Sequence, residues 1–190
     1  MLLSPTAMKS LNSIEKIQPR VIIATFNGNP ATTIISCYSP TNMADEEDVS
    51  IFYQELSSLV RQIPKHNIII IGGDMNSQIG RCKDHRYAFH STSNRNGQYL
   101  SDFILENQLV CLNTKYQKKS SKLWTFTYPN GVKAQLDYML INKKWINSAM
   151  NAEAYNSFGG VSSDHRIVTS KIRLSLRANK PKLPNTPIYN

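Results

Sequence analysis

Cysteine is scarce in this sequence, and no two cysteines stand in a C-x-x-C pattern. The 190 residues contain three of them, Cys37, Cys82 and Cys111. An odd count without paired spacing argues against a disulfide framework and against a structural zinc motif. Cys37 and Cys111 lie in apolar, strand-like runs, where cysteine serves as a small core residue. This usage fits a chain that folds in a reducing, intracellular compartment.

Long apolar runs are also absent. No stretch approaches the roughly 20 apolar residues that a membrane-spanning helix needs, and the opening Met1–Leu3 is far too short for a signal peptide. We find no repeat and no low-complexity block. We therefore expect one domain over residues 1–176 that makes no use of a membrane. The end of the chain, residues 177–190, contains three prolines and few apolar residues, and we expect it to be disordered.

Acidic residues are few compared with basic ones. Thirteen Asp and Glu stand against 22 Lys and Arg, which gives a formal charge of +9. Such an excess favours polyanionic partners, namely nucleic acid or an anionic membrane surface. The basic residues are dispersed rather than clustered in one run, so a basic protein without such a partner is the alternative. The loop over residues 115–122 carries four lysines, either as a solvated loop or as a contact for a phosphate backbone.

The first third of the chain is rich in β-formers. Val21–Phe26 and Thr32–Tyr38 read as two strands, and the turn residues between them predict an antiparallel hairpin. Residues 1–20 are ambiguous. We interpret Met1–Leu3 as the end of a strand and Lys9–Ile17 as a short connection that carries Glu15.

A helix is expected over Asp45–Ile63. Its apolar residues recur at spacings of three and four, and they are Val49, Phe52, Tyr53, Leu56, Val60 and Ile63. Acidic residues crowd the first turn, where the helix dipole favours anions, and Pro64 ends the pattern. The continuous apolar run Ile68–Ile71 follows directly and predicts a strand buried on both faces.

The remaining pattern alternates a helix with several strands. We expect a loop over residues 94–97 that leads into a helix through Leu100, Phe103, Ile104 and Asn107. Strands are expected over Leu109–Asn113, Leu123–Tyr128, Gln135–Ile141, Ala149–Ser157 and Val168–Leu176. Asp137 then lies in a strand interior, where a charged residue needs a partner. Together these elements predict a mixed α/β layered fold with a largely antiparallel sheet.

Polar residues follow the apolar run Ile68–Ile71 at once. Gly72 and Gly73 permit a sharp turn, and Asp74 and Asn76 come immediately after them. Carboxylate and amide oxygens are the ligands that Mg²⁺ takes in proteins. The competing interpretation is a strand followed by a polar turn, since Asp and Asn are common turn formers.

Other polar residues stand where a plain core needs none. Asp164 could join Asp74 in holding Mg²⁺ or Mn²⁺. The neighbouring His165 is a candidate acid or base, and Asp137 is the natural group to orient its ring. Tyr38 could donate its hydroxyl to a phosphate oxygen. By contrast, we do not expect zinc at His85 and His90, because they have no cysteine nearby.

These motifs, in this order, resemble those of the endonuclease/exonuclease/phosphatase superfamily. The similarity is finest to the endonuclease domains of LINE-type non-LTR retrotransposons and to the related craniofacial development protein 2-like proteins. It covers roughly residues 1–176. The segments that carry it are Tyr38-Ser39-Pro40-Thr41, Gly72-Gly73-Asp74-Met75-Asn76, Asn94-Arg95-Asn96-Gly97, Trp124-Thr125-Phe126, Leu136-Asp137-Tyr138 and Ser163-Asp164-His165.

The resemblance implies a four-layer α/β-sandwich and metal-dependent hydrolysis of a phosphodiester, usually the nicking of DNA. Under it, Asp74 positions or deprotonates the attacking water with help from Asn76, and Asp164 contributes to a Mg²⁺ or Mn²⁺ site. His165, oriented by Asp137, protonates the phosphate region. Tyr38 holds the scissile phosphate.

The resemblance also implies DNA as the partner and a nuclear location, and we take the chain to be a monomer. Six residues are expected to contact nucleic acid, namely Asn96, Lys115, Lys118, Lys119, Lys122 and Trp124.

One departure weakens the resemblance. The superfamily uses an Asn and a metal-binding Glu on early strands, and neither Asn27 nor Glu15 matches them. We therefore expect that the first strands of the family fold are missing. Two alternatives stay open: an inactive, retroelement-derived domain that binds nucleic acid, and a phosphatase of small phosphoesters.

Overall fold

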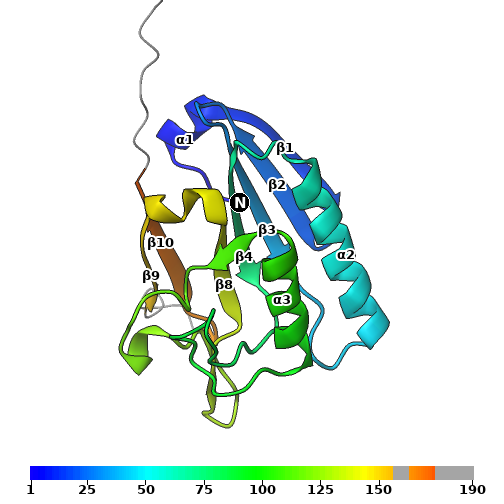
Figure 1. Cartoon of the computed structure of the whole chain (residues 1–190), viewed down its shortest axis with the longest axis vertical. Coiled ribbons are helices and arrows are strands. Elements are labelled where there is room, and N and C mark those ends of the chain that lie inside the picture. The colour runs from blue at the N-terminus through cyan, green and yellow to red at the C-terminus, as the bar shows by residue number, and fades with distance from the viewer. Residues whose placement is uncertain (156–162, 174–190) are drawn as a thin grey trace, which may run out of the picture.

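The computed structural model describes residues 1–155 and 163–173 (Figure 1). A six-stranded sheet forms its centre, with the strand order β1-β2-β3-β4-β8-β5. These strands are β1 (Leu11–Gln18), β2 (Val21–Phe26), β3 (Thr32–Tyr38), β4 (Ile68–Asp74), β5 (Leu109–Cys111) and β8 (Asp137–Asn142). Two further pairs are β9 (Ala149–Tyr155) with β10 (Ile167–Ile172), and β6 (Phe126–Thr127) with β7 (Lys133–Ala134).

The helices are α1 (Pro5–Ser10), α2 (Glu46–Gln62) and α3 (Arg95–Glu106), with short 3₁₀ helices η1 (Ser120–Lys122) and η2 (Lys143–Ser148). The strand pair β2–β3 is the predicted antiparallel hairpin. Helix α2 is the crossover that joins β3 to its parallel neighbour β4. Strand β4 then pairs antiparallel with β8, so the sheet is mixed.

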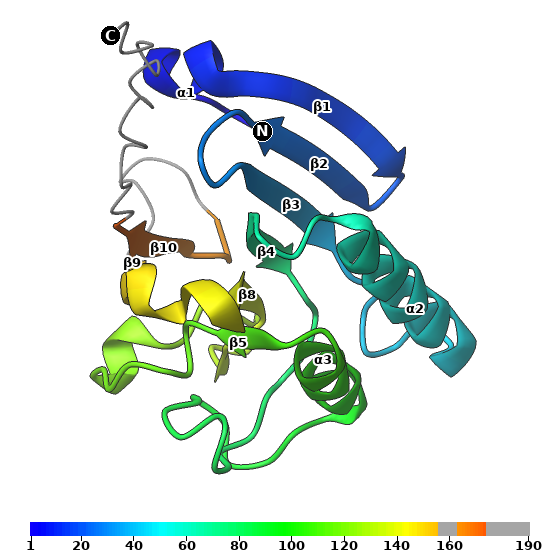
Figure 2. The ribbon, with the colours of Figure 1, turned by 45° about the horizontal axis from the view of Figure 1, so that its top comes forward.

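The large sheet is covered on both faces. Helices α2 and α3 pack on one face, and Figure 2 shows them side by side there. Aromatic contacts join the two helices, since Tyr53 stacks on Tyr99 with ring centroids 6.2 Å apart. On the other face, strands β4 and β8 pack against β9, β10 and η2 around a second apolar cluster that contains Ile68, Ile141 and Ala152.

This arrangement confirms the expected mixed α/β class. The described residues show a helix layer, the large sheet and the smaller sheet β9–β10. The second outer helix layer of the expected four-layer sandwich is not seen in residues 1–155 and 163–173. The expected domain end at 176 and the tail 177–190 lie outside the described residues, as do the ends of the two last expected strands.

The expectation for the first twenty residues is wrong. Ser4 caps the short helix α1, and Leu11–Gln18 is a full strand that pairs antiparallel with β2. Glu15 therefore lies in β1 rather than in a connection, and its side chain is exposed. The strand gave no alternating pattern because it lies at the sheet edge with most of its side chains exposed.

Several further boundaries differ from expectation; among them, β4 extends to Asp74 and β5 ends at Cys111. Within Leu123–Tyr128 only Phe126–Thr127 is a strand, β6, and the preceding Thr125 bonds through its N–H to Ala134 and through its carbonyl to Arg166. The expected loop at 94–97 is the first turn of α3, which Asn94 caps by accepting a hydrogen bond from the Gly97 N–H. Asp137 is the first residue of β8 rather than an interior one.

No helix in residues 1–155 and 163–173 has both the length and the apolar character needed to cross a membrane.

Replacing Gly73 by alanine should destabilise the fold strongly. Gly73 has φ +154°, and a Cβ there would lie 1.8 Å from the Cys37 carbonyl oxygen of β3. Since that oxygen belongs to the paired backbone, we expect a loss of at least about 3 kcal/mol in the free energy of unfolding, measured by urea denaturation.

Gly131→Ala is the matched control. Gly131 has φ +82° but nothing within 4 Å of the added Cβ, so only backbone strain of about 1–2 kcal/mol is expected. Equal losses in the two variants would contradict the close approach of β3 and β4.

Candidate active site

Strand register aligns three of the predicted site residues. Tyr38 at the end of β3 pairs with Asp74 at the end of β4, and Asp74 pairs with Asp137 at the start of β8. Residues opposite each other in a sheet point to the same face. The register thus puts the phenol and both carboxylates on the face opposite α2 and α3.

His165 reaches this row from the segment before β10. That segment lies against β6, where the Thr127 N–H donates to the Asp164 carbonyl and the Arg166 N–H to the Thr125 carbonyl. His165 and Phe126 form a β-bridge, with their ring centroids 4.7 Å apart. Backbone pairing and ring packing therefore fix where the imidazole stands.

The imidazole bridges the two carboxylates. His165 Nδ1 lies 3.0 Å from Asp137 Oδ2, and Nε2 lies 3.9 Å from Asp74 Oδ2. An ionised carboxylate only accepts hydrogen bonds, so Nδ1 carries a proton toward Asp137. The opposite ring nitrogen is thereby turned toward Asp74 and the open site, as the sequence predicts for an Asp-oriented histidine.

Burial shifts the acidity of both carboxyl groups. It raises the pKa of Asp74 to about 6, against the hydrogen bond that its Oδ1 accepts from the Asn76 N–H. The charges of Asp137 and Asp164 raise that pKa further, whereas His165 lowers it. Burial likewise raises the pKa of Asp137, opposed by Thr125 and His165.

Sequence reasoning missed two residues that position Asp137. The buried Thr125 hydroxyl accepts hydrogen bonds from the N–H groups of Leu136 and Asp137 and interacts with the Asp137 carboxylate. On the β5 side, Asn113 donates to the Asp137 carbonyl and accepts from the Met139 N–H. The only sequence signal for Thr125 was its place in the Trp124-Thr125-Phe126 motif, and Asn113 had none.

Asn76 also has a structural contact that the sequence did not predict. It has φ +45°, and its side-chain Nδ2 donates to the Ser39 carbonyl at 2.8 Å. One hydrogen of the Asn76 side-chain amide thus forms a hydrogen bond that joins the loops following β3 and β4. Its other hydrogen and its Oδ1 form no hydrogen bond within the described part of the chain, so orientation of a water or phosphate remains a prediction.

The expected nucleic-acid contact at Asn96 is wrong. Its side chain is fully buried, and Nδ2 donates to the carbonyls of Pro40 and Asn76. The residue therefore braces the two loops beside the site from within. Residues 94–97 were expected to form a loop, whereas Asn96 lies in the first turn of α3 on its buried side.

Three of the four predicted lysines contact a neighbouring side chain. Lys115 is one of them, because its Nζ lies 5.9 Å from the centroid of the Tyr116 ring. Lys118 pairs with Glu153 at 3.3 Å, and Lys122 lies over the Tyr155 ring. Lys115 and Lys119 are exposed. Contact of these lysines with nucleic acid stays a prediction.

Trp124 contacts two cations that sequence reasoning did not single out. Arg166 lies 3.9 Å and Lys133 4.7 Å from its ring centroid. Arg166 also donates to the carbonyls of Tyr155 and Ser121. The Trp124 ring is already in contact with these two cations, and its predicted contact with nucleic acid stays a prediction.

The residues present suit only an open metal site. No three His, Cys, Asp or Glu side chains in residues 1–155 and 163–173 converge as a closed metal centre. However, the mutual repulsion of Asp74, Asp137 and Asp164 is what a cation would relieve. Mg²⁺ commonly takes one or two carboxylates and completes its shell with water and substrate phosphate, and Asp74 with Asp164 could serve that purpose.

Comparison with known proteins decides the family. The model of a family described as "Endonuclease-reverse transcriptase" matches residues 32–169, a span that holds Tyr38, Asp74, Asp137 and His165. The chain belongs to this endonuclease–reverse transcriptase family. It lies within the endonuclease/exonuclease/phosphatase superfamily, as the sequence motifs indicate.

Family relatives include craniofacial development protein 2 of Bos taurus, which is 33% identical over 164 residues. That match covers 83% of this chain and 27% of the bovine protein. The protein of the same name in Tragulus javanicus is also 33% identical over 164 residues, with 83% and 28% covered. The chain therefore spans about a quarter of the length of these relatives.

Solved structures share the fold of the family. The endonuclease domain of TRAS1, a telomere-specific non-LTR retrotransposon, superposes with a TM-score of 0.60 at 15% identity, covering 83% of this chain and 65% of that one. The 3′ phosphatase NExo from Neisseria, bound to a product DNA hairpin, gives 0.63 at 17%, covering 84% and 67%. The AP endonuclease LMAP from Leishmania major gives 0.62 at 12%, covering 84% and 56%.

Asp74→Asn should stabilise the folded chain at neutral pH. The carboxyl pKa is about 6 in the folded state against 3.8 ordinarily, so its ionised form disfavours folding, and this cost grows as pH rises from about 4 through 6. Asn is neutral and keeps an acceptor for the Asn76 N–H. We expect a gain of about 1–3 kcal/mol at pH 7.5 and little at pH 4.

Urea denaturation of both proteins at the two pH values measures this difference. Asp102→Asn removes one exposed carboxylate on α3 and should change stability by less than about 0.5 kcal/mol at either pH. If Asp74→Asn lowers the free energy of unfolding at pH 7.5, ionisation of Asp74 does not disfavour the folded state.

Proposed function

We propose that this domain hydrolyses phosphodiester bonds of DNA with the help of Mg²⁺ or Mn²⁺, as a nicking endonuclease of the retroelement type. The observation that carries the proposal is the imidazole of His165 standing between two carboxylates, Asp137 at 3.0 Å and Asp74 at 3.9 Å. This pattern places an oriented acid–base group beside a carboxylate whose pKa is raised to about 6.

The relatives support the reaction class. The named structures include an endonuclease domain of a retrotransposon, an AP endonuclease and a 3′ phosphatase with product DNA. The formal charge of +9 suits a polyanionic substrate. These facts support a phosphoesterase of nucleic acid, and the choice of DNA nicking follows from the retrotransposon similarity.

The residues of this chain divide the chemistry between them. Asp74, ionised above about pH 6, accepts the proton of the attacking water. His165 donates its Nδ1–H to the Asp137 carboxylate and, as an acid, presents an Nε2–H to the phosphate or its leaving oxygen. Tyr38, about half exposed at the end of β3, offers its hydroxyl to a phosphate oxygen.

A divalent ion bound at Asp74 and Asp164 would supply charge stabilisation for the phosphate oxygens. Asp164 is exposed and stands directly before His165, so it can approach such an ion without disturbing the imidazole.

A second candidate is a nucleic-acid-binding domain that does not hydrolyse its ligand. It is favoured by the lack of a closed metal centre within the described residues. Both candidates predict DNA binding, and only the first predicts turnover.

Plasmid nicking by the purified chain with Mg²⁺ tests the proposal. We expect His165→Ala and Asp74→Ala to lower the nicking rate about 10²- to 10⁴-fold because each removes a proton-transfer group, and a chelator to abolish it. Conversion of supercoiled to open-circular DNA on gels is the measurement. A folded chain that binds DNA but never nicks it supports the second candidate. Hydrolysis of a small phosphoester without nicking supports a phosphatase.

Asp137→Asn tests the orientation of His165 separately. The amide can hold the His165 imidazole in the wrong tautomer, so we expect the nicking rate to fall about 10³- to 10⁴-fold with DNA affinity nearly unchanged.

In the wild-type protein, the nicking rate should rise as pH passes about 6, where Asp74 loses its proton. A rate that stays flat between pH 5 and 7.5 would contradict the role of Asp74 as base.

A further inference from the structure

A cation that no motif singled out lies beside Tyr38. Arg20 stands in the turn between β1 and β2, and its guanidinium carbon lies 5.4 Å from the centroid of the Tyr38 ring. The backbone fixes this position, since the Tyr38 N–H donates to the Arg20 carbonyl. Arg20 is exposed, so its charge faces solvent at the same sheet edge as the candidate active site.

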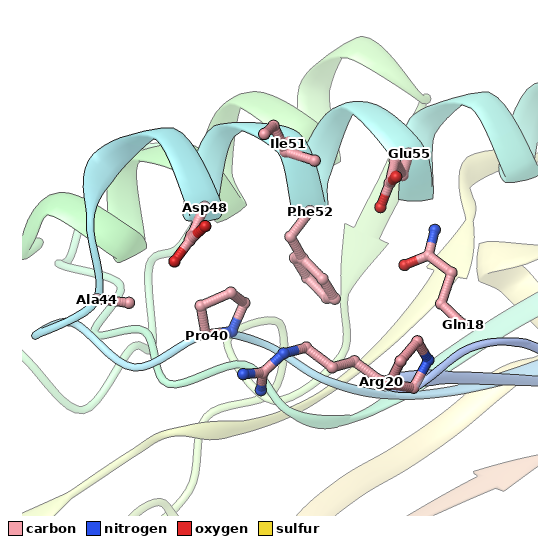
Figure 3. A pocket seen from close by; sticks show the side chains of 9 residues that line it. Gln18, Arg20, Pro40, Ala44, Asp48, Ile51, Phe52 and Glu55 are labelled. Atoms are coloured by element: carbon pink, nitrogen blue, oxygen red, sulfur yellow. The ribbon is translucent and has the colours of Figure 1, made fainter.

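The guanidinium is not engaged in an ion pair. In residues 1–155 and 163–173, no carboxylate oxygen lies within 4.0 Å of it. Asp48 and Glu55 of α2 line the same pocket of about 280 Å³. In Figure 3 the Arg20 side chain extends under Pro40, on the side of Ala44. The acidic wall would repel a phosphate from the pocket interior, which leaves the outer side of the guanidinium for an anion.

An exposed apolar residue stands on the next loop. Thr41–Ala44 is a tight turn in which the Ala44 N–H donates to the Thr41 carbonyl, and Met43 in this turn is 92% exposed. The turn is held firmly, because Arg95 donates to the carbonyls of Asn42 and Ala44 at 3.1 and 2.8 Å. A braced loop that displays an exposed apolar side chain is suited to contact with a ligand, since no ordering of the backbone is needed on binding.

This loop belongs to the site edge. Asn96 bonds to both Pro40 and Asn76, so the segment leading to the turn is tied to the loop that follows Asp74. Arg20 and Tyr38 therefore stand on one flank of the catalytic row, and Met43 lies in the turn between Pro40 and Ala44, which line the same pocket as Arg20. The β6–β7 hairpin and His165 stand on the other flank. His165 forms a bridge with Phe126 of β6 and reaches the row at β8, which lies beyond β4 from β3 in the sheet.

We propose that Arg20 and Met43 form a nucleic-acid contact surface on the Tyr38 flank of the site. Arg20 binds a backbone phosphate next to the one that is cleaved, and Met43 packs against the sugar or base of the same strand. Guanidinium suits phosphate through paired N–H donors, and Met is among the apolar side chains that proteins place against base steps. This inference rests on the proposed function, because it assigns the substrate's path across that site.

Salt-dependent binding of a short DNA duplex, measured by fluorescence anisotropy with chelator present, tests the surface. Loss of one phosphate contact reduces the slope of log affinity against log salt by about 0.9, so Arg20→Ala should show this change and Arg20→Lys should restore most of it. Met43→Ala should weaken binding about 3- to 10-fold with the slope unchanged, because its contact carries no charge.

Two matched controls lie away from the site. Lys65→Ala removes an exposed charge before β4, at the opposite end of that strand, and Leu105→Ala removes an exposed apolar side chain near the end of α3. Neither should change affinity or slope beyond error, and thermal melting checks that all variants fold.

If the wild-type chain binds the duplex but Arg20→Ala keeps its slope, or resembles Lys65→Ala, the surface is overturned while the proposed function stands. If the wild-type chain binds no DNA even at about 50 mM salt, the proposed function fails and this inference fails with it.

Discussion

Two carboxylates, Asp74 and Asp137, stand directly opposite each other on the adjacent strands β4 and β8. Like charges in such a pair repel, and both side chains are largely buried. The imidazole of His165 lies between them and can carry the positive charge that relieves the repulsion. The rest of the site follows from this arrangement, because any group that binds there meets two acids and one shared histidine.

The cost of this charge cluster explains the dense bracing around it. Thr125 and Asn113 hold the start of β8 from its two sides. Asn76 and Asn96 join the loops after β3 and β4. All four residues bond to backbone groups, while Thr125 also bonds to the Asp137 carboxylate and Asn96 to the Arg95 guanidinium. The charged side chains therefore project from a firmly held backbone. Such supporting contacts are what keep a catalytic constellation in productive geometry.

The charge distribution around the site is asymmetric. On the hairpin flank the cations are already engaged, with Arg166 and Lys133 over Trp124 and Lys122 over Tyr155. On the Tyr38 flank, Arg20 has no carboxylate partner in the described residues. Arg20 lies over the Tyr38 ring at 5.4 Å, so a phosphate that binds it competes with a ring contact and not with an ion pair.

The sequence by itself determined the local elements that have a strong period. Helix α2 was predicted within one residue at each end, and β4 was predicted from its first residue but three residues too short, because an apolar stripe and a continuous isoleucine run depend on burial alone. The order of Tyr38, Asp74, Asp137 and His165 at strand ends could also be predicted, since polar residues that interrupt apolar runs point to a function.

Only the tertiary structure decided what these residues do together. Strand register aligned Tyr38, Asp74 and Asp137, and the pairing of residues 164–166 with β6 placed His165 beside them. Asn96, expected at the surface, is buried and joins two loops instead. Edge strand β1 and the cation Arg20 left no trace in the sequence, because an exposed strand has no burial pattern and a single arginine gains meaning only from its neighbours.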